Sequence, residues 1–516
     1  MSDSSSHTGR RETGRLIIFL VLGLFLLAWL FWFGADLLSK HGLERYEQQR
    51  EAMGEHFNFA DFIPKPVLDE SNFALAPIVA GGYEEMMNQN GRPTHSRNGD
   101  VDDPLVMEIY GGKSRVQTPD GGNWALGQPT DLKAFQRYYR SLAQSGDANA
   151  FPVAPQPQSP AADVLLALSR YDEPIEELRQ AAALPDSRFP LNYHSDPPAG
   201  ILLPHLAELK GPSQVLELRA VSELQNGQND AALADVELML RLMASVRDEP
   251  FLISHLVRVA LLNLALQPVW EGTQAHRWTD SQLKELDRDL AGLDFLADYQ
   301  FCMRGECAIG MADMDYFRRT RKAVMDYGAH TMPSALELEL RFGPDSIYYH
   351  NESVFARAFQ EWILPIVDVR RHTVSLKAAR VATTNLEAMD LNLTVNNVLA
   401  ATSLFYGRSL ERFSHAQSCV NMARLAIALE RYRLVHSIYP ETLKALTPDF
   451  IESIPHDIIG GKPLKYHRSS GGRFVLYSVG WNGSDDGGKI AFLGASKTSI
   501  DYEKGDWVWA GEPQAP

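Results

Sequence analysis

The sequence has few cysteines, no excess of basic residues and no familiar catalytic motif. Only three of its 516 residues are cysteine, too few for the disulfide framework that stabilises many small secreted domains. Acidic residues outnumber basic ones by 65 to 49, and the formal charge of −16 argues against a nucleic-acid partner. The patterns HExxH, GxSxG, GxxxxGK[ST] and a post-strand GxGxxG are all missing. The sequence therefore favours a role other than that of a common hydrolase or nucleotide-binding enzyme.

Length and hydrophobic pattern predict a mainly α protein with more than one domain. A chain of 516 residues is too long for a single core, and a hydrophobic fraction of 45% predicts that most of it folds. We expect five segments: a cytoplasmic tail over 1–15, a transmembrane helix over 16–35, a juxtamembrane helix with a loop-rich stretch over 36–130, a helical hairpin or bundle domain over 131–412, and a small α+β domain over 413–511.

The segment 16–35 reads LIIFLVLGLFLLAWLFWFGA and carries no charge. Twenty apolar residues suffice for a helix to cross the hydrocarbon core of a bilayer. A cleaved signal peptide usually has a shorter apolar region and ends in small residues, so Phe33-Gly34-Ala35 favours an uncleaved anchor. Basic residues precede the segment and predict a cytoplasmic tail, although others follow it: Arg10, Arg11 and Arg15 before, and Lys40, Arg45 and Arg50 after. No second apolar run is expected to be long enough to span.

After the anchor, an amphipathic pattern predicts a helix to about Phe57. The stretch 81–130 contains the turn signals GG, NGR, DDP and DGG. LVMEIY at 105–110 and SRVQ at 114–117 flank Gly111-Gly112, and this arrangement predicts one β-hairpin within a loop.

Helical signals dominate from Asp131 to Arg412. Ser159 followed by Pro160 predicts a helix start, and TDSQ at 279–282 predicts a capping box. FLISHLVRVALLNLALQPVW is apolar nearly all round, which indicates a central helix. The segment LELRAVSELQNGQNDAALADVELMLRL resembles one tetratricopeptide unit, with Arg219 where a leucine is usual. Such repeats need about three copies to share a core, so the resemblance implies a helical hairpin rather than a peptide-binding groove.

Polar side chains in this helical region offer only weak site candidates. His205 and Glu208 share a helix face near His194, which is compatible with a metal pocket, but we expect a helix start after Pro204 with ordinary polar contacts. Buried charges on the apolar helices are expected to pair with charges elsewhere. An enzyme would require a deep pocket lined by two or more of five residues: Glu208, His255, Arg258, Arg304 and Glu306.

The cysteines are expected to be free unless the chain breaks near Gly305. Cys302 and Cys307 are five residues apart, which places their thiols on different faces of a continuous helix. Cys419 lies among small residues and is expected to pack in the core.

The last hundred residues carry the clearest pattern. Ala416, Val420, Ala423 and Ile427 recur at helical spacing, which predicts a helix with one face on a sheet. Tyr439-Pro440 ends this helix, a short helix follows over 441–446, and KPLKYHR and RFVLYSV alternate as a hairpin joined by SSGG.

This order of elements resembles the globular domain of type II secretion major pseudopilins (protein G-like). The quoted strings are ALERYRLVHSIYPETLKAL, IPHDIIGGKPLKY and FVLYSVGWNGSDDGG, which lie in this order within 413–511. The resemblance implies an extracytoplasmic, non-enzymatic module. It also implies calcium in the loop after the last main strand, where oxygen side chains followed by glycine suit a hard cation. The implied ligands are Asn482, Asp485, Asp486, Asp501 and Asp506; the alternative is a solvated turn without an ion.

The N-terminus departs from that family's pattern. Pseudopilins begin with a glycine, an aromatic residue or methionine, and a glutamate at the fifth position; here Arg15 follows Gly14, and Phe19 stands in the place of the glutamate. The whole chain also resembles bacterial membrane-anchored proteins with such a tail, which implies no activity. We therefore expect a single-pass protein of the bacterial inner membrane, mostly periplasmic, that acts as a scaffold or interaction protein with protein partners. The alternatives are an extracytoplasmic hydrolase with its site in the helical domain and a secretion-system accessory protein.

Overall fold

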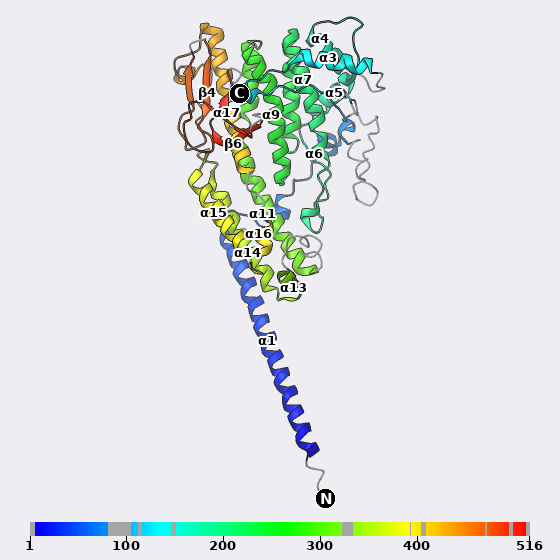
Figure 1. Cartoon of the computed structure of the whole chain (residues 1–516), viewed down its shortest axis with the longest axis vertical. Helices are drawn as coiled ribbons and strands as arrows, with labels where there is room; N and C mark the ends of the chain where they lie inside the picture. Colours follow the sequence, from blue (N-terminus) through cyan, green and yellow to red (C-terminus); the bar gives the residue numbers. More distant parts are fainter. Residues whose placement is uncertain are drawn as a thin grey trace.

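The computed structural model describes residues 6–80, 105–111, 116–145, 151–321, 334–392, 394–403, 409–469, 472–494 and 499–511. It is mainly helical, with 62% helix and 8% strand arranged in a few small sheets, and the expected fold class is confirmed at that level. Figure 1 shows an elongated head from which one long helix projects toward the N-terminus.

The projecting helix is α1, Ser6–Glu51. Its large apolar side chains are exposed from Leu16 to Leu24 and from Leu26 to Phe33, whereas Leu43 and Tyr46 are buried against α14, Ser346–Arg357. Asp36 directly follows the apolar run, and its Oδ1 accepts a hydrogen bond from the Ser346 backbone N–H at 2.5 Å. The predicted apolar helix is therefore present, and its second half is built into the head.

By length and composition, two helices could cross a membrane: the Leu16–Glu51 part of α1 and α9, Leu252–Gln274. We expected only one apolar run long enough to span a bilayer, and by length and composition that expectation is wrong. The apolar window of α1 is not buried at all, whereas 61% of the window in α9 is buried. The burial of α9 confirms its expected central position, between α7, α8, α11 and α17.

The first strand of the hairpin predicted near Gly111 is absent, because residues 105–110 form no strand. Part of the second predicted strand, 114–117, lies outside the described residues. Tyrosine hydroxyls take up the backbone groups that a partner strand would have used. Tyr171 Oη accepts from the Glu108 N–H at 3.1 Å and donates to the Glu108 carbonyl at 3.0 Å. Tyr139 donates to the Ile109 carbonyl, and Tyr138 accepts from the Gly111 N–H.

The helical body consists of antiparallel neighbours around α9. Its helices are α3 (Leu132–Gln144), α4 (Pro160–Leu168), α5 (Asp172–Ala182), α6 (His205–Glu208), α7 (Lys210–Asn226), α8 (Asn229–Ala244), α10 (Asp280–Ala291) and α11 (Phe295–Thr320). Ser159 and the Thr279–Gln282 capping box begin α4 and α10 as predicted. Gly227, with φ of +80°, turns α7 into α8, so the predicted hairpin is confirmed. Arg219, in the usual leucine position, pairs with buried Asp235 at 3.1 Å.

The expected core roles of the cysteines are confirmed. Cys302, Cys307 and Cys419 are free and buried. The chain does not break at Gly305, which lies inside α11. A Cβ there would come within 2.2 Å of the Pro250 carbonyl oxygen, so this glycine allows α11 to lie directly against the backbone that precedes α9.

The lower head consists of α13 (Ser334–Phe342), α14, a π-helical turn at Ala358–Ile363, a 3-10 turn at Leu364–Ile366, α15 (Leu376–Leu391) and α16 (Val398–Ser403). The short strands β1 (Val367–Asp368) and β2 (Thr373–Val374) pair as a hairpin between these helices. Figure 1 shows α13 and α14 at the end of the head from which α1 emerges.

The C-terminal region follows the predicted order. Helix α17, Ser409–His436, is followed by a 3-10 helix at Leu443–Leu446, within the short helix predicted over 441–446. Strands β3 (Lys465–Arg468), β4 (Phe474–Ser478) and β7 (Trp507–Trp509) form one antiparallel sheet, and β5 (Ile490–Leu493) pairs with β6 (Ser499–Gly505). The predicted hairpin is β3–β4.

Helix α17 is shared between the sheet and the helical body. It contacts β4 and β7 as predicted, and it also contacts α9, α10 and α11, so it is buried on nearly all sides rather than on one face. Figure 1 shows it between the green helices and the orange and red strands. The C-terminal module is thus joined to the helical body by a common core helix.

Candidate functional site

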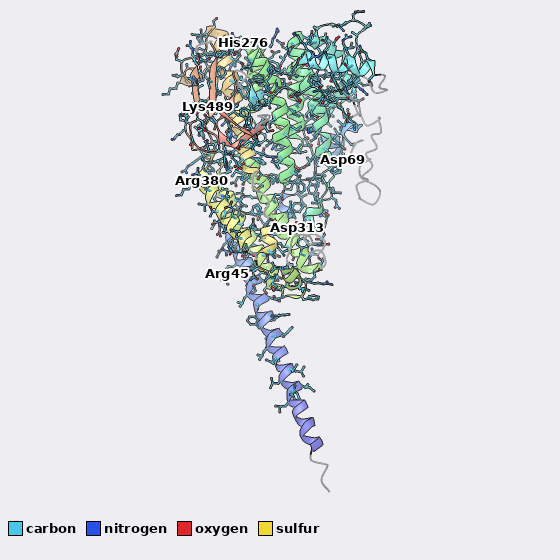
Figure 2. All side chains as sticks on the ribbon, in the orientation of Figure 1. Arg45, Asp69, His276, Asp313, Arg380 and Lys489 are labelled. Atoms are coloured by element: carbon cyan, nitrogen blue, oxygen red, sulfur yellow. The ribbon has the colours of Figure 1, made fainter. Side chains whose placement is uncertain are left out.

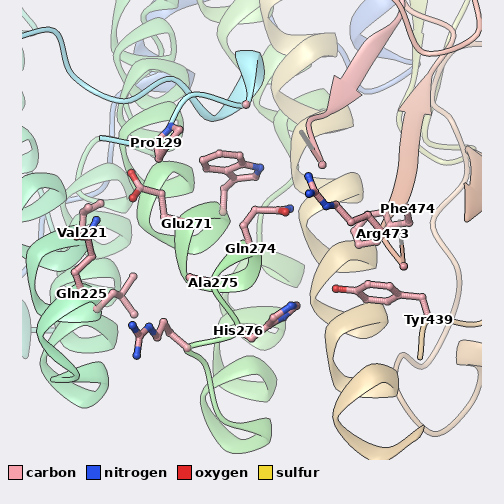
Figure 3. A pocket seen from close by; sticks show the side chains of 16 residues that line it. Pro129, Val221, Gln225, Glu271, Gln274, Ala275, His276, Tyr439, Arg473 and Phe474 are labelled. Carbon is pink, nitrogen blue, oxygen red and sulfur yellow. The ribbon is translucent and has the colours of Figure 1, made fainter. Parts of the chain in front are cut away.

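A cleft of about 630 Å³ lies where the helical body meets the C-terminal module (Figure 3). Its size is in the range of small-molecule sites. One wall comes from α7 and the end of α9, the other from Tyr439 and the start of β4. The described lining residues are Gly127, Pro129, Val221, Leu224, Gln225, Trp270, Glu271, Gln274, Ala275, His276, Arg277, Tyr439, Gly472, Arg473, Phe474 and Gly511.

The chain turn after α9 sets the position of His276. The Arg277 N–H bonds to the Gly272 carbonyl at 2.8 Å, and His276 adopts a positive φ of +53°. Trp278 then folds back on the helix, where a Cβ on Gly272 would come within 2.1 Å of its Nε1. A small residue at 272 therefore allows the tight turn that exposes His276 and Arg277 at the mouth of the cleft.

His276 is held by a carboxylate from the opposite wall. Its Nδ1 lies 2.9 Å from Oε1 of Glu430, which belongs to α17 and is fully buried. Arg433 donates two hydrogen bonds to Glu430, at 2.8 and 2.6 Å, and the Tyr439 hydroxyl donates a third at 3.1 Å. Burial and the Glu430 carboxylate raise the pKa of Tyr439. Since Nδ1 is engaged, Nε2 is the nitrogen that the half-exposed ring presents to a bound group (side chain 46% exposed).

The cleft floor links distant segments of the chain. Trp270 Nε1 donates to the Ala510 carbonyl at 2.6 Å, and Trp124 packs on Trp509 with ring centroids 5.3 Å apart. Glu271 Oε1 accepts from the N–H and hydroxyl of Thr130, at 2.9 and 2.7 Å. Burial raises the pKa of Glu271 in spite of these donors. The floor is therefore fixed before any ligand arrives, which reduces the ordering cost of binding.

The lining combines cationic, amide and aromatic side chains. Arg277 and Arg473 are exposed at the rim, and the aromatic rings of Trp270, Tyr439 and Phe474 line the walls. Among the described lining residues there is no serine, threonine, cysteine or lysine to act as a nucleophile. Figure 3 shows Gln274, His276 and Arg473 around one hollow with Tyr439. The arrangement can hold an acidic group through cationic and amide donors while an apolar body rests on the aromatic rings.

The loop predicted to bind calcium is closed by its own hydrogen bonds. Both carboxylate oxygens of Asp506 accept from the Asp486 N–H, and Oδ2 also accepts from Gly488 at 2.6 Å. Asn482 donates to Asp486 at 2.8 Å. Asp485 accepts from Tyr477 and pairs with Lys465 at 2.7 Å.

The fifth predicted ligand, Asp501, pairs with Lys504 at 3.5 Å. The structure thus brings Asn482, Asp486 and Asp506 to one loop and engages Asp485 and Asp501 with lysines. Within the described ranges, no three His, Cys, Asp or Glu side chains converge in a geometry that could hold a metal.

The polar residues weighed in the helical region have structural partners. His205 Nε2 lies 2.8 Å from Glu249 Oε1, and its ring stacks on Phe189. Arg258 pairs with Asp298, as expected of a buried charge. The remaining partners are His255 with the Glu249 carbonyl, Arg304 with Glu55, and Glu306 with the Leu252 N–H.

None of these residues, nor Glu208 or His194, lines the cleft between the body and the C-terminal module. This cleft is therefore not the pocket that the alternative reading, a hydrolase, would require. The residues that do meet at the cleft, His276 and Glu430, are 154 positions apart, a separation that no local motif encodes. One signal in the sequence pointed to this pairing. Glu430 in ALERYRL is a charged residue on a helix that proves to be buried, and a buried charge requires a partner.

Comparison with protein-family models, curated proteins and solved structures finds no match to this chain.

Proposed function

We propose that this protein is a single-pass, membrane-anchored interaction protein whose extracytoplasmic head binds an acidic group carried on an apolar body. The observation that carries the proposal is the cleft between the helical body and the C-terminal module. It combines a cationic rim, a histidine oriented by a buried glutamate and aromatic walls.

The exposed apolar surface of α1 supports the membrane location. Side chains from Leu16 to Phe33 are exposed on all faces of the helix, and large contiguous apolar surfaces are costly in water. The run is long enough to cross a bilayer, and Trp29, Trp32 and Phe33 sit where aromatic residues favour the membrane interface. The arginines at 10, 11 and 15 support a cytoplasmic N-terminus and an extracytoplasmic head in a bacterial inner membrane.

The order of elements in the C-terminal module supports its pseudopilin-like character. A long helix, a β-hairpin and an Asp/Gly-rich loop occur in the sequence that the resemblance implies. On this basis the module acts as a docking domain for protein partners, and a role beside a secretion system is one form that such docking takes.

Calcium binding by the loop after β4 is part of this proposal. The donor type fits a hard cation, and Asp506, between β6 and β7, is hydrogen-bonded to the loop that carries Asn482 and Asp486, with Asp485 and Asp501 as further oxygen donors. Calcium at a hundredfold excess over its Kd is expected to stabilise the fold by about 3 kcal/mol. The measurement is the melting temperature in EDTA and in added calcium, with Asp486→Asn as the binding-deficient variant. An unchanged transition contradicts calcium binding and leaves Asp506 as a cap of the loop.

The cleft is tested with a matched pair of probes. Full-length protein in detergent is titrated by calorimetry with 4-phenylbutyrate and with its neutral counterpart, 4-phenylbutanamide. Because charge-assisted hydrogen bonds stabilise more than neutral ones, the carboxylate is expected to bind about tenfold more tightly. Arg277→Gln combined with Arg473→Gln should remove that preference.

The control variant is Arg371→Gln, which alters an exposed arginine outside the cleft lining. It should leave both affinities unchanged. Equal affinity for the acid and the amide, no saturable binding of either, or a double variant that still prefers the acid would each overturn the proposed binding role.

A further inference from the structure

Exposed apolar side chains gather at the base of the head, where α1 leaves it. On α13, Leu338 and Phe342 are 58% and 66% exposed. They are four residues apart and therefore share one face of the helix. Figure 1 shows α13 at the same end of the head as the emerging α1, opposite the C-terminus. A paired apolar face at this place differs from a single exposed leucine elsewhere, which needs no explanation.

A hydrogen bond joins the start of α14 to α1 where the apolar run of α1 ends. Asp36 is the first charged residue after that run, and it accepts from the Ser346 N–H at 2.5 Å. Ser346 begins α14, four residues after the last residue of α13. With 16–35 in the hydrocarbon core, Asp36 lies at its boundary and α13 lies in the headgroup region. Leu37 and Leu38 are exposed at the same level of α1.

Charges of both signs surround this face: Glu339 of α13 is exposed, Lys40 of α1 pairs with Glu44 at 3.7 Å, and Arg341 lies beside Phe342. The Arg341 guanidinium lies 5.2 Å from the Phe342 ring centroid, so a cation accompanies the aromatic ring. Lys40 and Arg45 are exposed on the adjoining turns of α1. Long basic side chains beside apolar ones are typical of helices that lie in a membrane interface, because the stem stays in the apolar layer while the charge reaches phosphate.

We propose that α13 lies on the extracytoplasmic membrane surface and inserts Leu338 and Phe342 at the boundary between headgroups and acyl chains. This inference rests on the proposed membrane anchoring by α1. With two contacts, the bilayer fixes the tilt of the head as well as its attachment. The cleft is then held away from the membrane, since Figure 2 shows His276 at the end of the head opposite α1.

The test measures the depth of spin labels on the full chain. Nitroxide labels are placed at Leu22→Cys, Leu338→Cys, Phe342→Cys and Leu68→Cys, and the protein is reconstituted in nanodiscs of phosphatidylcholine and phosphatidylglycerol. The three native cysteines are buried and free, and all four labelled positions are exposed, so the fold should tolerate the labels. Circular dichroism verifies the fold of each variant. The readout is the ratio of collisions with oxygen to collisions with a water-soluble nickel chelate.

The labels at Leu338→Cys and Phe342→Cys are expected to show a ratio about threefold or more above that at Leu68→Cys, as for side chains a few ångströms inside the interface. The label at Leu22→Cys should show the highest ratio. A deep label at position 22 with water-like labels at 338 and 342 would overturn the seating of α13 while anchoring stands. A water-like label at position 22 would overturn anchoring itself, and the inference with it.

Discussion

Replacing Arg258 with methionine is expected to lower the free energy of unfolding by about 3–5 kcal/mol at pH 8, because it leaves a buried carboxylate without its cation. Arg258 is only 2% exposed and pairs with Asp298 through Nη1. Its Nε also donates to the Met243 carbonyl at 3.2 Å. The measurement is urea unfolding of the detergent-solubilised chain followed by tryptophan fluorescence.

The loss should depend on pH in a definite direction. Burial raises the pKa of Asp298 to about 6 even beside Arg258, and removal of the arginine raises it further. The folded variant therefore binds this proton more tightly than the unfolded chain does, so its stability falls as the pH rises through neutrality. At pH 5, where Asp298 is protonated in the variant, much of the loss should disappear.

Two further variants distinguish destabilisation by loss of the ion pair from destabilisation by loss of the arginine side chain alone. Arg258→Met with Asp298→Leu removes both charges and should recover most of the stability, because an apolar pair can replace a buried ion pair. Arg371→Met alters an exposed pair with Asp368 at 3.8 Å and should change stability by less than about 0.5 kcal/mol. A loss below about 1 kcal/mol in Arg258→Met at pH 8 would contradict the role of this pair.

The Arg258–Asp298 pair also shows how much of the structure could be predicted from the sequence. A charge on an all-apolar helix predicts that a partner exists, and that expectation is confirmed. Which acid supplies the partner depends on how α9 and α11 cross, and no spacing in the chain records that crossing. Likewise, the spacing of residues along the chain does not predict that His276 at the cleft pairs with Glu430.

Local signals were reliable where neighbouring residues alone determine the structure. The Thr279 capping box, the Ser159 cap and the β3–β4 hairpin each depend on contacts within a few residues or across a short turn. The predicted strand at 105–110 failed because its backbone is bonded by tyrosine hydroxyls 30 and 63 positions away. Tertiary contacts thus decided the conformation of a segment whose own pattern suited a strand.

Glu352 is expected to make the stability of the head depend on pH at the junction with α1. It is 6% exposed, and its Oε1 has no hydrogen-bond partner among the described residues. Burial, followed by the carboxylate of Asp315, raises its pKa from 4.5 to about 8, while Arg318 acts in the opposite direction and Glu47 of α1 adds to the rise. Burial and its acidic neighbours on α1 likewise raise the pKa of Glu47 to about 7.

The sign of the effect follows from these shifts. The folded state holds the Glu352 proton more tightly than the unfolded chain, so the associated stability is fully present below pH 4.5 and is lost as the pH rises toward 8. Glu352→Gln keeps the shape of the side chain and removes the ionisation. The variant should match the natural protein at pH 5 and exceed its free energy of unfolding by on the order of 2–4 kcal/mol at pH 8.5.

The measurement is urea unfolding at half-unit intervals from pH 5 to pH 8.5, with Glu339→Gln as the matched control on the exposed surface of α13. The control should follow the natural protein throughout. Parallel curves for Glu352→Gln and the natural protein would show that Glu352 is ionised and solvated in the folded state. Divergence above pH 6 would instead place a proton-sensitive carboxylate where α14 packs against α1, and its deprotonation would weaken that packing.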